Sequence, residues 1–319
     1  MKKIAILTSG GDAPGMNPHI RAAVRAALSR GLEVVGVIGG YSGLIEGDFI
    51  KLGRKETANI IGRGGTILKT SRSKEFMMAG GRAAAAERVR EAGIEGIIAC
   101  GGDGTFHGAH ALWVEHKIPV VGTPGTIDND LFGTHYTIGY DTAINTAAEA
   151  IDRIRDTADS HGRVFIVEVM GRHAGFIAMD VGIACGAEYI AIPETMTNLD
   201  ILYQRILKQG KTRRTIIIVG EGDENGGAAR ISQLMKENYE IEAKFTILGH
   251  IQRGGSPTVR DRVLASHLGV AAVEALINGK TDVMVGRQGH EIVYTPLEET
   301  WLRQKAIWSY MIELSEVLA

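Results

Sequence analysis

The sequence predicts an α/β protein with two three-layer α/β/α domains and mostly parallel sheets. Strand-like and helical segments alternate along the chain, as they do when each strand is followed by a crossover helix. Several strand-like segments are apolar at successive positions, which indicates strands covered on both faces. The length of 319 residues is sufficient for two domains of ordinary size.

Nine short segments have the apolar character of strands: 3–8, 33–38, 96–100, 119–123, 164–169, 189–192, 215–219, 245–248 and 283–286. The first helical stretch carries Ile20, Val24 and Leu28 on one face. A later one begins near Asp141 and Thr142, which are good helix N-cap residues. This order predicts Rossmann-like domains, and a break near residues 133–140 could separate them.

Composition excludes several classes of function. The net charge of −2 gives no reason to expect nucleic acid or an anionic membrane as a partner. Cys100 and Cys185 lack metal-binding spacing and are expected to be buried thiols in a reducing compartment. No apolar run approaches the ~18 residues of a membrane helix, and the apolar run 4–7 is too short for a signal peptide. We therefore expect a cytoplasmic protein.

Two glycine-rich loops follow predicted strands and precede predicted helices, where backbone N–H groups can bind an anion. Residues 8–17 fit neither the dinucleotide fingerprint nor the common P-loop. The second loop, GGDGT at 101–105, combines three glycines with a carboxylate that could hold Mg²⁺ on a phosphate. The alternative is a tight turn with a capping Asp. The pattern resembles the nucleotide loop of several kinase families and predicts phosphoryl transfer without naming the acceptor.

A carboxylate-rich loop, PGTIDND, occupies 124–130 after another predicted strand. In an extended segment Thr126, Asp128 and Asp130 would point the same way. Phosphoryl transfer needs a metal ligand, a base and polar contacts to the moving group, and these side chains could supply them. The alternative is an ordinary Asp-rich turn.

Six motifs together resemble the bacterial ATP-dependent 6-phosphofructokinases: LTSGGDAPGMN, RGGTIL, GGDGT, PGTIDND, EVMGRHAG and LGHIQRGGSP. The resemblance extends from residue 1 past residue 286. It implies Mg²⁺-dependent transfer of the γ-phosphate of ATP to the 1-hydroxyl of fructose 6-phosphate, a glycolytic step that gives fructose 1,6-bisphosphate and ADP. It also implies an ATP-binding domain at 1–138 plus 251–300 and a sugar-phosphate domain at 139–250 plus 301–319.

The resemblance implies a role for individual residues. Asp128 resembles the base, Arg172 and Arg72 the cations that balance charge on the transferred group, and Asp103 and Asp130 the Mg²⁺ ligands. Gly11 and Thr126 would donate to phosphate oxygens. The positions matching the ATP site are Gly11, Tyr41, Arg72, Ser73, Gly102, Asp103, Gly104 and Thr105.

The sugar phosphate would contact residues from several motifs: Thr126, Asp128, Asp130, Met170, Gly171, Arg172, Glu221, His250 and Arg253. In the family two further basic residues reach it from a neighbouring subunit, and Arg163 and Lys244 match them. Lys244 stands where the family usually has Arg, which removes a bidentate fork. Glycine at positions 104 and 125, in place of the Asp and Lys of pyrophosphate-dependent relatives, indicates use of ATP.

An effector site for ADP or phosphoenolpyruvate between subunits of a homotetramer is also implied, with allosteric control. Its matching positions are Arg21, Arg25, Arg54, Arg155, Glu188 and Lys211. Arg21 and Arg25 are spaced i and i+4, so their charges repel unless an anion lies between them; the alternative is a solvated helix face.

Two alternatives remain open at this point, and a third feature invites a metal site. The protein could be a kinase for another sugar phosphate, such as tagatose 6-phosphate or sedoheptulose 7-phosphate. It could be a nucleotide-sensing regulator without catalysis, although Asp103 and Asp128 are both present. His107, His110 and His116 could suggest a metal site, but their spacing fits no common zinc motif.

Overall fold

The computed structural model describes residues 1–209 and 214–319. The chain divides into two compact units. Unit 1 comprises Met1–Ile127, Leu131–Thr142 and Arg253–Lys305, and unit 2 comprises Asp128–Asp130, Ala143–Gln252 and Ala306–Ala319. These units differ from the expected domain bounds at residues 128–130, 139–142, 251–252 and 301–305.

Unit 1 is built on a seven-stranded sheet with the strand order β11-β10-β5-β4-β1-β2-β3. Only the pairs β2–β3 and β10–β11 at its two edges are antiparallel. The strands of this sheet are β1 (Lys3–Thr8), β2 (Glu33–Val37), β3 (Phe49–Lys51), β4 (Ile97–Gly101), β5 (Val120–Pro124), β10 (Val283–Gln288) and β11 (Glu291–Pro296).

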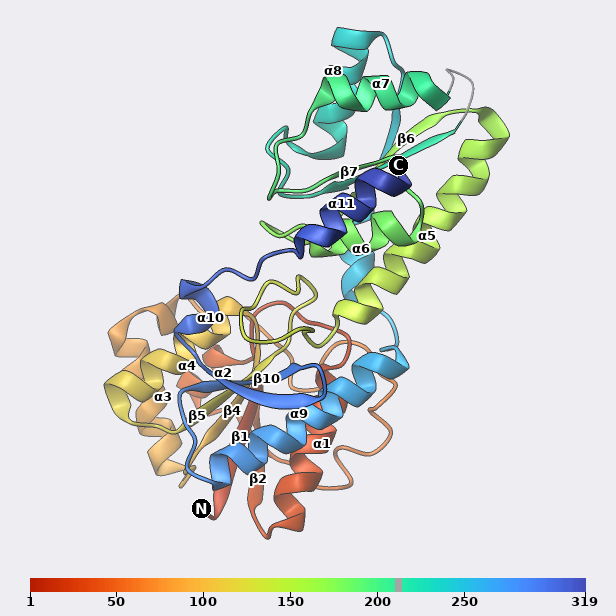
Figure 1. Cartoon of the computed structure of the whole chain (residues 1–319). Helices are drawn as coiled ribbons and strands as arrows, with labels where there is room; N and C mark the ends of the chain where they lie inside the picture. The colour runs from red at the N-terminus through yellow and green to blue at the C-terminus, as the bar shows by residue number, and fades with distance from the viewer. Residues whose placement is uncertain (210–213) are drawn as a thin grey trace. The chain divides into compact units, whose positions relative to one another are not determined.

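Helices cover both faces of this sheet (Figure 1). Helices α1 and α9 lie side by side on one face, and α3 and α4 cover the other. The helices of unit 1 are α1 (Met16–Ser29), α2 (Tyr41–Glu46), α3 (Ala79–Glu91), α4 (Asp103–His116), α9 (Val259–Ile277) and α10 (Glu299–Leu302), with a 3-10 turn η1 at Glu75–Met77. The three-layer arrangement expected for this unit is confirmed.

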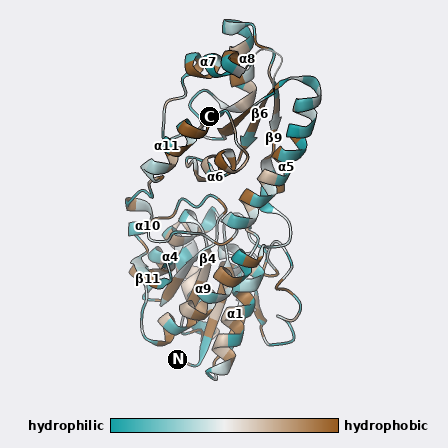
Figure 2. Cartoon of the chain, turned by 45° about the vertical axis from the view of Figure 1, so that its right-hand side comes forward, coloured by the Kyte–Doolittle hydropathy of each residue, from teal (hydrophilic) through white to brown (hydrophobic). Residues whose placement is uncertain are grey.

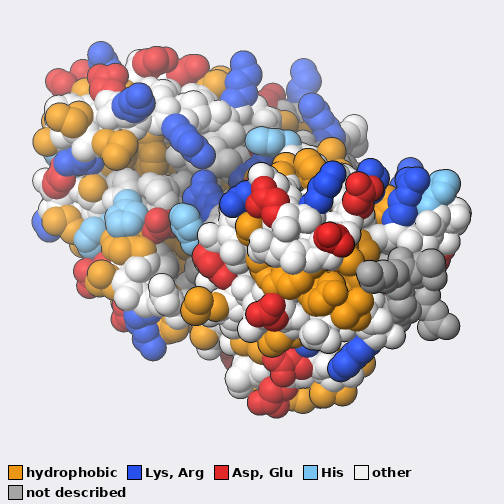
Figure 3. All heavy atoms as spheres, turned by 90° about the horizontal axis from the view of Figure 1, so that it is seen from above, with side chains coloured by type: hydrophobic (Ala, Val, Ile, Leu, Met, Phe, Trp, Pro, Cys, Tyr) orange, Lys and Arg blue, Asp and Glu red, His pale blue; other side chains and the backbone are white. Residues whose placement is uncertain are grey.

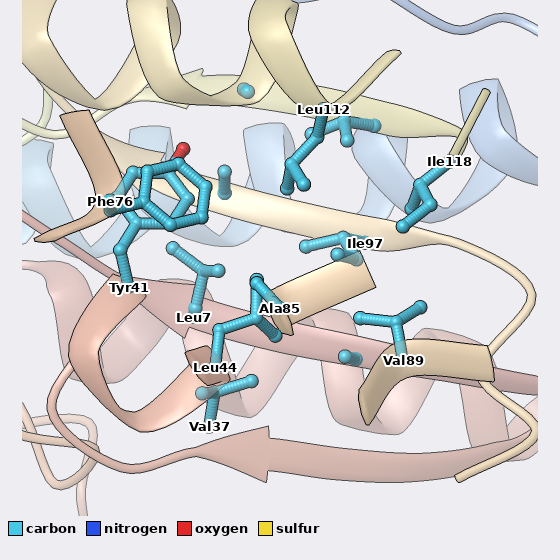
Figure 4. Close-up of a cluster of buried hydrophobic side chains, with 14 of the residues drawn as sticks. Leu7, Val37, Tyr41, Leu44, Phe76, Ala85, Val89, Ile97, Leu112 and Ile118 are labelled. Atoms are coloured by element: carbon cyan, nitrogen blue, oxygen red, sulfur yellow. The ribbon is translucent and has the colours of Figure 1, made fainter. Parts of the chain in front are cut away.

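The core between the sheet and helices α2, α3 and α4 is a continuous apolar cluster (Figure 4). Leu7 and Ile97 point into it from the central strands, and Leu112 from α4. Tyr41 and Phe76 stack their rings at one end of the cluster, with centroids 4.0 Å apart. Burial of each such side chain contributes about 1.5–3 kcal/mol to the stability of the fold. The strand ends that carry the glycine loops are therefore rigidly anchored.

Unit 2 contains a four-stranded, all-parallel sheet with the order β7-β8-β6-β9. Its strands are β6 (Val164–Val169), β7 (Tyr189–Ala191), β8 (Thr215–Gly220) and β9 (Lys244–Ile247). Its helices are α6 (Phe176–Ala184), α7 (Leu199–Gln209), α8 (Gly227–Tyr239) and α11 (Ser309–Leu318), with η2 at Gly249–Arg253, while α5 (Tyr140–His161) begins in unit 1 and continues into unit 2. α6 is almost uniformly hydrophobic, whereas α5 carries both hydrophobic and hydrophilic residues (Figure 2).

All nine predicted strands are present, with ends shifted by at most two residues. The prediction missed β3 and β11, which are the edge strands of the large sheet. β3 has only three residues, and the sequence EIVYTP of β11 mixes charged, polar and apolar residues. Edge strands are short or polar because a continuous apolar edge would pair with other chains, so they lack the apolar signal used for prediction.

The surface in one view carries charges of both signs, and the two cysteines are buried. Lys, Arg, Asp and Glu side chains are interspersed on the face shown in Figure 3, without a broad field of one sign. Cys100 and Cys185 are both free and buried, as predicted. Within residues 1–209 and 214–319, the structure contains no helix with the length and apolarity that crossing a membrane requires.

A buried polar chain lies beneath the glycine loops. His19 of α1 is fully buried, and its Nε2 lies 3.0 Å from Thr123 Oγ1 at the end of β5. Thr123 also hydrogen-bonds to Cys100 at the end of β4, and burial raises the pKa of Cys100 to about 12. Burial lowers the pKa of His19 to about 4, because the protonated imidazole would lose its hydration.

We expect acid to destabilise the fold through His19. The unfolded imidazole titrates at 6.5 and the folded one at about 4, so between these values the unfolded chain binds more protons. The free energy of unfolding should therefore decrease as the pH falls from 6.5 towards 4, on the order of 1 kcal/mol per pH unit.

Urea denaturation of the parent and of His19→Gln across pH 5 to 7 measures this effect. Gln keeps a polar group near Thr123 but does not titrate, so the variant should lack this part of the slope. His290→Gln, at an exposed histidine, serves as control. An equally steep slope in His19→Gln would contradict the assignment.

Candidate active site

The strand order of unit 1 brings three loops to one edge of the sheet. β1 pairs with β2 on one side and with β4 on the other, and β4 pairs in turn with β5. The loops after β1, β4 and β5 therefore all begin at the carboxyl ends of the parallel strands. The chain continues from β1 to β2 on one side and to β4 on the other, so the strand order reverses between β1 and β4. Open α/β sheets bind ligands at this switch point.

The three loops approach each other so closely that only glycine fits at position 101. A Cβ on Gly101 would lie 2.2 Å from Thr105 Oγ1 and 2.5 Å from Ser9 O. Thr105 Oγ1 donates to Ser9 O, and Gly125 N donates to Gly101 O at 2.9 Å. These contacts join the loops after β1, β4 and β5 into one backbone cradle.

Helix α4 begins inside this cradle, at Asp103. No side chain caps its first turn, and Gly102 at the N-cap is extended. The Cβ position of Gly102 lies 3.6 Å from the Thr126 Cβ, so these two predicted phosphate contacts are neighbours. A Cβ on Gly104 would meet nothing within 4 Å. Free N–H groups at a helix N-terminus beside open space favour an anionic group.

Tyr41 supports the cradle from below. Its ring is 5% exposed and belongs to the apolar core, and its hydroxyl donates to the carbonyl of Thr105. Ser73 Oγ accepts from Phe76 N, while Arg72 is exposed. Of the predicted ATP-site residues, Tyr41 therefore holds a loop in place, whereas Arg72 presents a free surface charge.

Arg253 fills the space that a side chain at Gly11 would need. A Cβ on Gly11 would lie 2.5 Å from Arg253 Nη1, and the same guanidinium nitrogen is 3.5 Å from Asp12 O. Gly11 and Arg253 come from motifs more than 240 residues apart. The structure thus brings a predicted phosphate donor and a predicted sugar-phosphate cation into contact within unit 1.

In unit 2 a carboxylate and a guanidinium meet at the carboxyl end of β6. Asp128 is 2% exposed, and its Oδ2 lies 3.5 Å from Arg172 Nε. Arg172 has a positive φ of 54°, and its backbone N donates to Glu221 Oε1 at 2.7 Å. Strained backbone at a non-glycine residue persists where the surroundings enforce it, and here it directs the Arg172 side chain to Asp128.

Gln252 is a site residue that sequence reasoning missed. It is fully buried, accepts from Met170 N at 3.3 Å and donates to Gly249 O at 3.1 Å. It thereby joins the segment after β6 to η2, which carries His250, an exposed residue. The available signal was its place inside the LGHIQRGGSP motif, between two residues that were singled out.

The extended conformation expected for the carboxylate loop is wrong. The chain bends at Ile127 and Asp128, and Asn129 has a left-handed φ of 55°. The strict alternation that would align Thr126, Asp128 and Asp130 is therefore broken. Asn adopts this conformation more readily than most residues, which allows a nearly buried loop to turn there.

Arg163 and Lys244 lie at the amino ends of the strands of the unit 2 sheet, whereas Arg172 lies beyond their carboxyl ends. Arg163 precedes β6, and Lys244, the first residue of β9, is paired with Phe165. Met170, Gly171 and Arg172 follow the other end of the six-residue strand β6, about 20 Å away at the usual rise per residue. Within one chain these two groups of residues do not converge on one small ligand.

The predicted effector residues form two groups. Arg21 and Arg25 lie on α1, and the charge of Arg21, burial and the charge of Arg54 lower the pKa of Arg25. In unit 2, Arg155 Nε and Nη2 are buried, and neither has a hydrogen-bond partner among residues 1–209 and 214–319. The Glu188 carboxylate accepts a hydrogen bond from Ile216 N through Oε2 at 2.6 Å. Lys211 lies outside the described residues.

The predicted metal ligands are divided between the units, with Asp103 in unit 1 and Asp130 in unit 2. Among the described residues no three His, Cys, Asp or Glu side chains converge as metal ligands. Asp103 Oδ1 is buried and accepts no hydrogen bond from the described residues, and it lies 3.4 Å from His107 Nε2. A site with few protein carboxylates fits Mg²⁺, which takes most of its ligands from water and phosphates.

The histidines that suggested a metal site have other neighbours. His107 stacks on Trp301 with ring centroids 3.8 Å apart, and His110 Nδ1 lies 2.8 Å from Asp282 Oδ1. His116 Nε2 is 3.7 Å from Glu115. These contacts attach α4 to α10 and to the start of β10, which is a structural role.

Comparison with known proteins identifies relatives over the full length. A protein of Thermus thermophilus named ATP-dependent 6-phosphofructokinase 1 is 57% identical over an alignment of 322 positions that covers all of both chains. An ATP-dependent 6-phosphofructokinase of Cytophaga hutchinsonii is 51% identical, and the alignment covers all of this chain and 98% of the relative.

Solved structures show the same fold. Phosphofructokinase of Pichia pastoris superimposes on 94% of this chain with a TM-score of 0.87 and 37% identity. The match covers 35% of the Pichia chain, so the present chain spans about a third of its length. The family model described as Phosphofructokinase matches residues 3–276, and the chain belongs to the phosphofructokinase family.

Proposed function

We propose that this protein is an ATP-dependent 6-phosphofructokinase, a phosphotransferase that moves the γ-phosphoryl group of ATP to the 1-hydroxyl of fructose 6-phosphate. Full-length relatives at 51% and 57% identity carry this name. They support this function over a kinase for tagatose 6-phosphate or sedoheptulose 7-phosphate and over a catalytically inactive regulator.

The observation that carries the proposal is the pairing of Asp128 with Arg172. Asp128 is 2% exposed and held 3.5 Å from a guanidinium. A carboxylate in this setting accepts the proton of the attacking hydroxyl, and the guanidinium compensates negative charge on the transferred group. Phosphoryl transfer needs little more than such positioning and charge compensation.

The backbone cradle of unit 1 would hold the phosphates of ATP. The N-terminus of α4, with Gly102 and Gly104, offers N–H groups and open space to them. Asp103 and Asp130 would hold Mg²⁺, which neutralises phosphate charge when bound. Thr126, beside Gly102, would contact the transferred group from the loop after β5.

A complete sugar-phosphate site would need two chains. Met170, Glu221 and His250 are in unit 2 with Asp128, whereas Arg163 and Lys244 lie at the amino ends of the strands of the unit 2 sheet. Arg163 and Lys244 would therefore contact the sugar phosphate of a neighbouring subunit. This arrangement supports an oligomer in which neighbouring chains share a site, and the proposed oligomer is a homotetramer in the cytoplasm.

The two arginine groups would bind an anionic effector between subunits. Arg25 Nε and Arg155 Nε are buried donors that have no hydrogen-bond partner in the described part of the chain, and charged donors form strong hydrogen bonds to anions. ADP or phosphoenolpyruvate has the charge that this group of arginines would bind.

We expect Asp128→Asn to lower kcat by about 10²–10⁴-fold, because the amide keeps the size of the side chain but cannot take the proton. ADP release from ATP, Mg²⁺ and fructose 6-phosphate measures the rate. Asp156→Asn, at an exposed position of α5, is the matched control. A folded Asp128→Asn with parental kcat would exclude Asp128 as the base.

We expect Gly104→Asp to fold normally but to lose affinity for ATP. Its side chain has open space, so the fold is spared, while the new carboxylate would repel a nucleotide phosphate. KM for ATP is measured beside that of Gly104→Ala, which adds a side chain without charge. Parental KM for ATP in the Asp variant would place the nucleotide elsewhere.

Mixed oligomers test the shared site. In the proposed shared site, one chain contributes Asp128 and its neighbour contributes Lys244. When Asp128→Asn and Lys244→Ala chains are refolded together, some sites combine the intact Asp128 of one chain with the intact Lys244 of the other. The mixture should therefore have activity well above the mean of the two separate proteins. A mixture of Asp128→Asn with Arg172→Ala should not, because both residues belong to one chain's part of the site. Equal behaviour of the two mixtures would refute sharing.

A further inference from the structure

Asn17 is a buried residue that no part of the proposed mechanism uses. It lies in the first turn of α1, directly after the glycine loop, and is 1% exposed. Its Nδ2 donates to the carbonyls of Arg63 and Gly64, both at 3.1 Å, and its Oδ1 accepts from Ile67 N at 2.7 Å. One amide therefore holds three backbone groups of the segment 63–67.

That segment is also attached to the glycine loop by threonines. Thr66 Oγ1 lies 3.0 Å from Thr8 Oγ1 at the end of β1, and Thr70 Oγ1, three residues beyond the segment, donates to Gly10 O at 2.7 Å. The segment 63–67 is thus positioned by the loop after β1. It has no regular secondary structure of its own, so these hydrogen bonds determine its course.

The sequences RGGT at 63–66 and RGGS at 253–256 cross at their glycines. A Cβ on Gly64 would lie 2.3 Å from Gly255 O, so the two backbones are in direct contact. Ser256 Oγ donates to Gly62 O at 2.8 Å and joins them a second time. Because interiors are close-packed and stiff, a displacement of residues 63–65 moves residues 253–256 with it.

The moved segment begins with Arg253, whose guanidinium occupies the gap at Gly11. We propose that Asn17 is a positioning residue for Arg253. It acts through the contact between Gly64 and Gly255 and sets the place of the guanidinium beside the glycine loop. The inference rests on the proposed function, in which Arg253 contacts the sugar phosphate.

Two variants test this path from its two ends. Asn17→Asp keeps the acceptor for Ile67 N but loses both donations and faces two carbonyl oxygens with a carboxylate. Gly64→Ala introduces a Cβ that forces the two backbones apart. In each, KM for fructose 6-phosphate should rise at least about tenfold, a loss of about 1.4 kcal/mol, while KM for ATP changes much less.

The double variant and a control refine the test. Residues acting along one path are not additive, so the double variant should raise KM for fructose 6-phosphate by less than the product of the single effects. Asn278→Asp adds the same charge at the exposed C-terminal end of α9 and should leave both KM values unchanged.

The outcomes are distinguishable. Active variants with reduced thermal stability but parental KM for fructose 6-phosphate would show a merely structural role for Asn17 and overturn the inference alone. If Asn17→Asp does not fold, Gly64→Ala decides by the same criterion. A parent protein that does not turn over fructose 6-phosphate would overturn the proposed function and this inference together.

Discussion

The close approach of other atoms to the backbone at three glycines of unit 1 is the constraint on which the proposed site depends. Gly101 lies against Ser9 O and Thr105, Gly11 against Arg253, and Gly64 against Gly255. In each case a single added Cβ would force atoms apart. These contacts hold distant parts of the sequence together, and the apolar core packs against the strands of the same sheet.

The residues that the proposed function uses belong to two units. The cradle, the N-terminus of α4 and Asp103 are in unit 1, whereas Asp128 and Arg172 are in unit 2. The carboxylate loop joins them in sequence, since residues 128–130 leave unit 1 and return to it within three positions. Asn129, the middle residue of these three, has a positive φ. The residue that would take the proton is thus grouped with the residues that would hold the sugar.

The sequence was sufficient to predict the architecture and the main motifs because both leave local signals. All nine strands that were predicted from apolar runs are present in the structure. Glycine pairs marked the loops that approach other parts of the backbone. Signals failed where a residue acts through distant partners. Gln252 and Asn17 look like ordinary amides in sequence, and their roles appear only when Met170 and Gly64 lie beside them. The bend at Asp128 was missed because alternation assumes an extended chain.

The central claim is that the site transfers phosphate from ATP to the 1-hydroxyl of a sugar phosphate and does not release it to water. Phosphorus NMR of a reaction with ATP, Mg²⁺ and fructose 6-phosphate tests this most directly. The account predicts one new phosphomonoester, that of fructose 1,6-bisphosphate, formed in equal amount to ADP. Inorganic phosphate formed with ADP and no second sugar phosphate, or turnover with pyrophosphate and none with ATP, would contradict it.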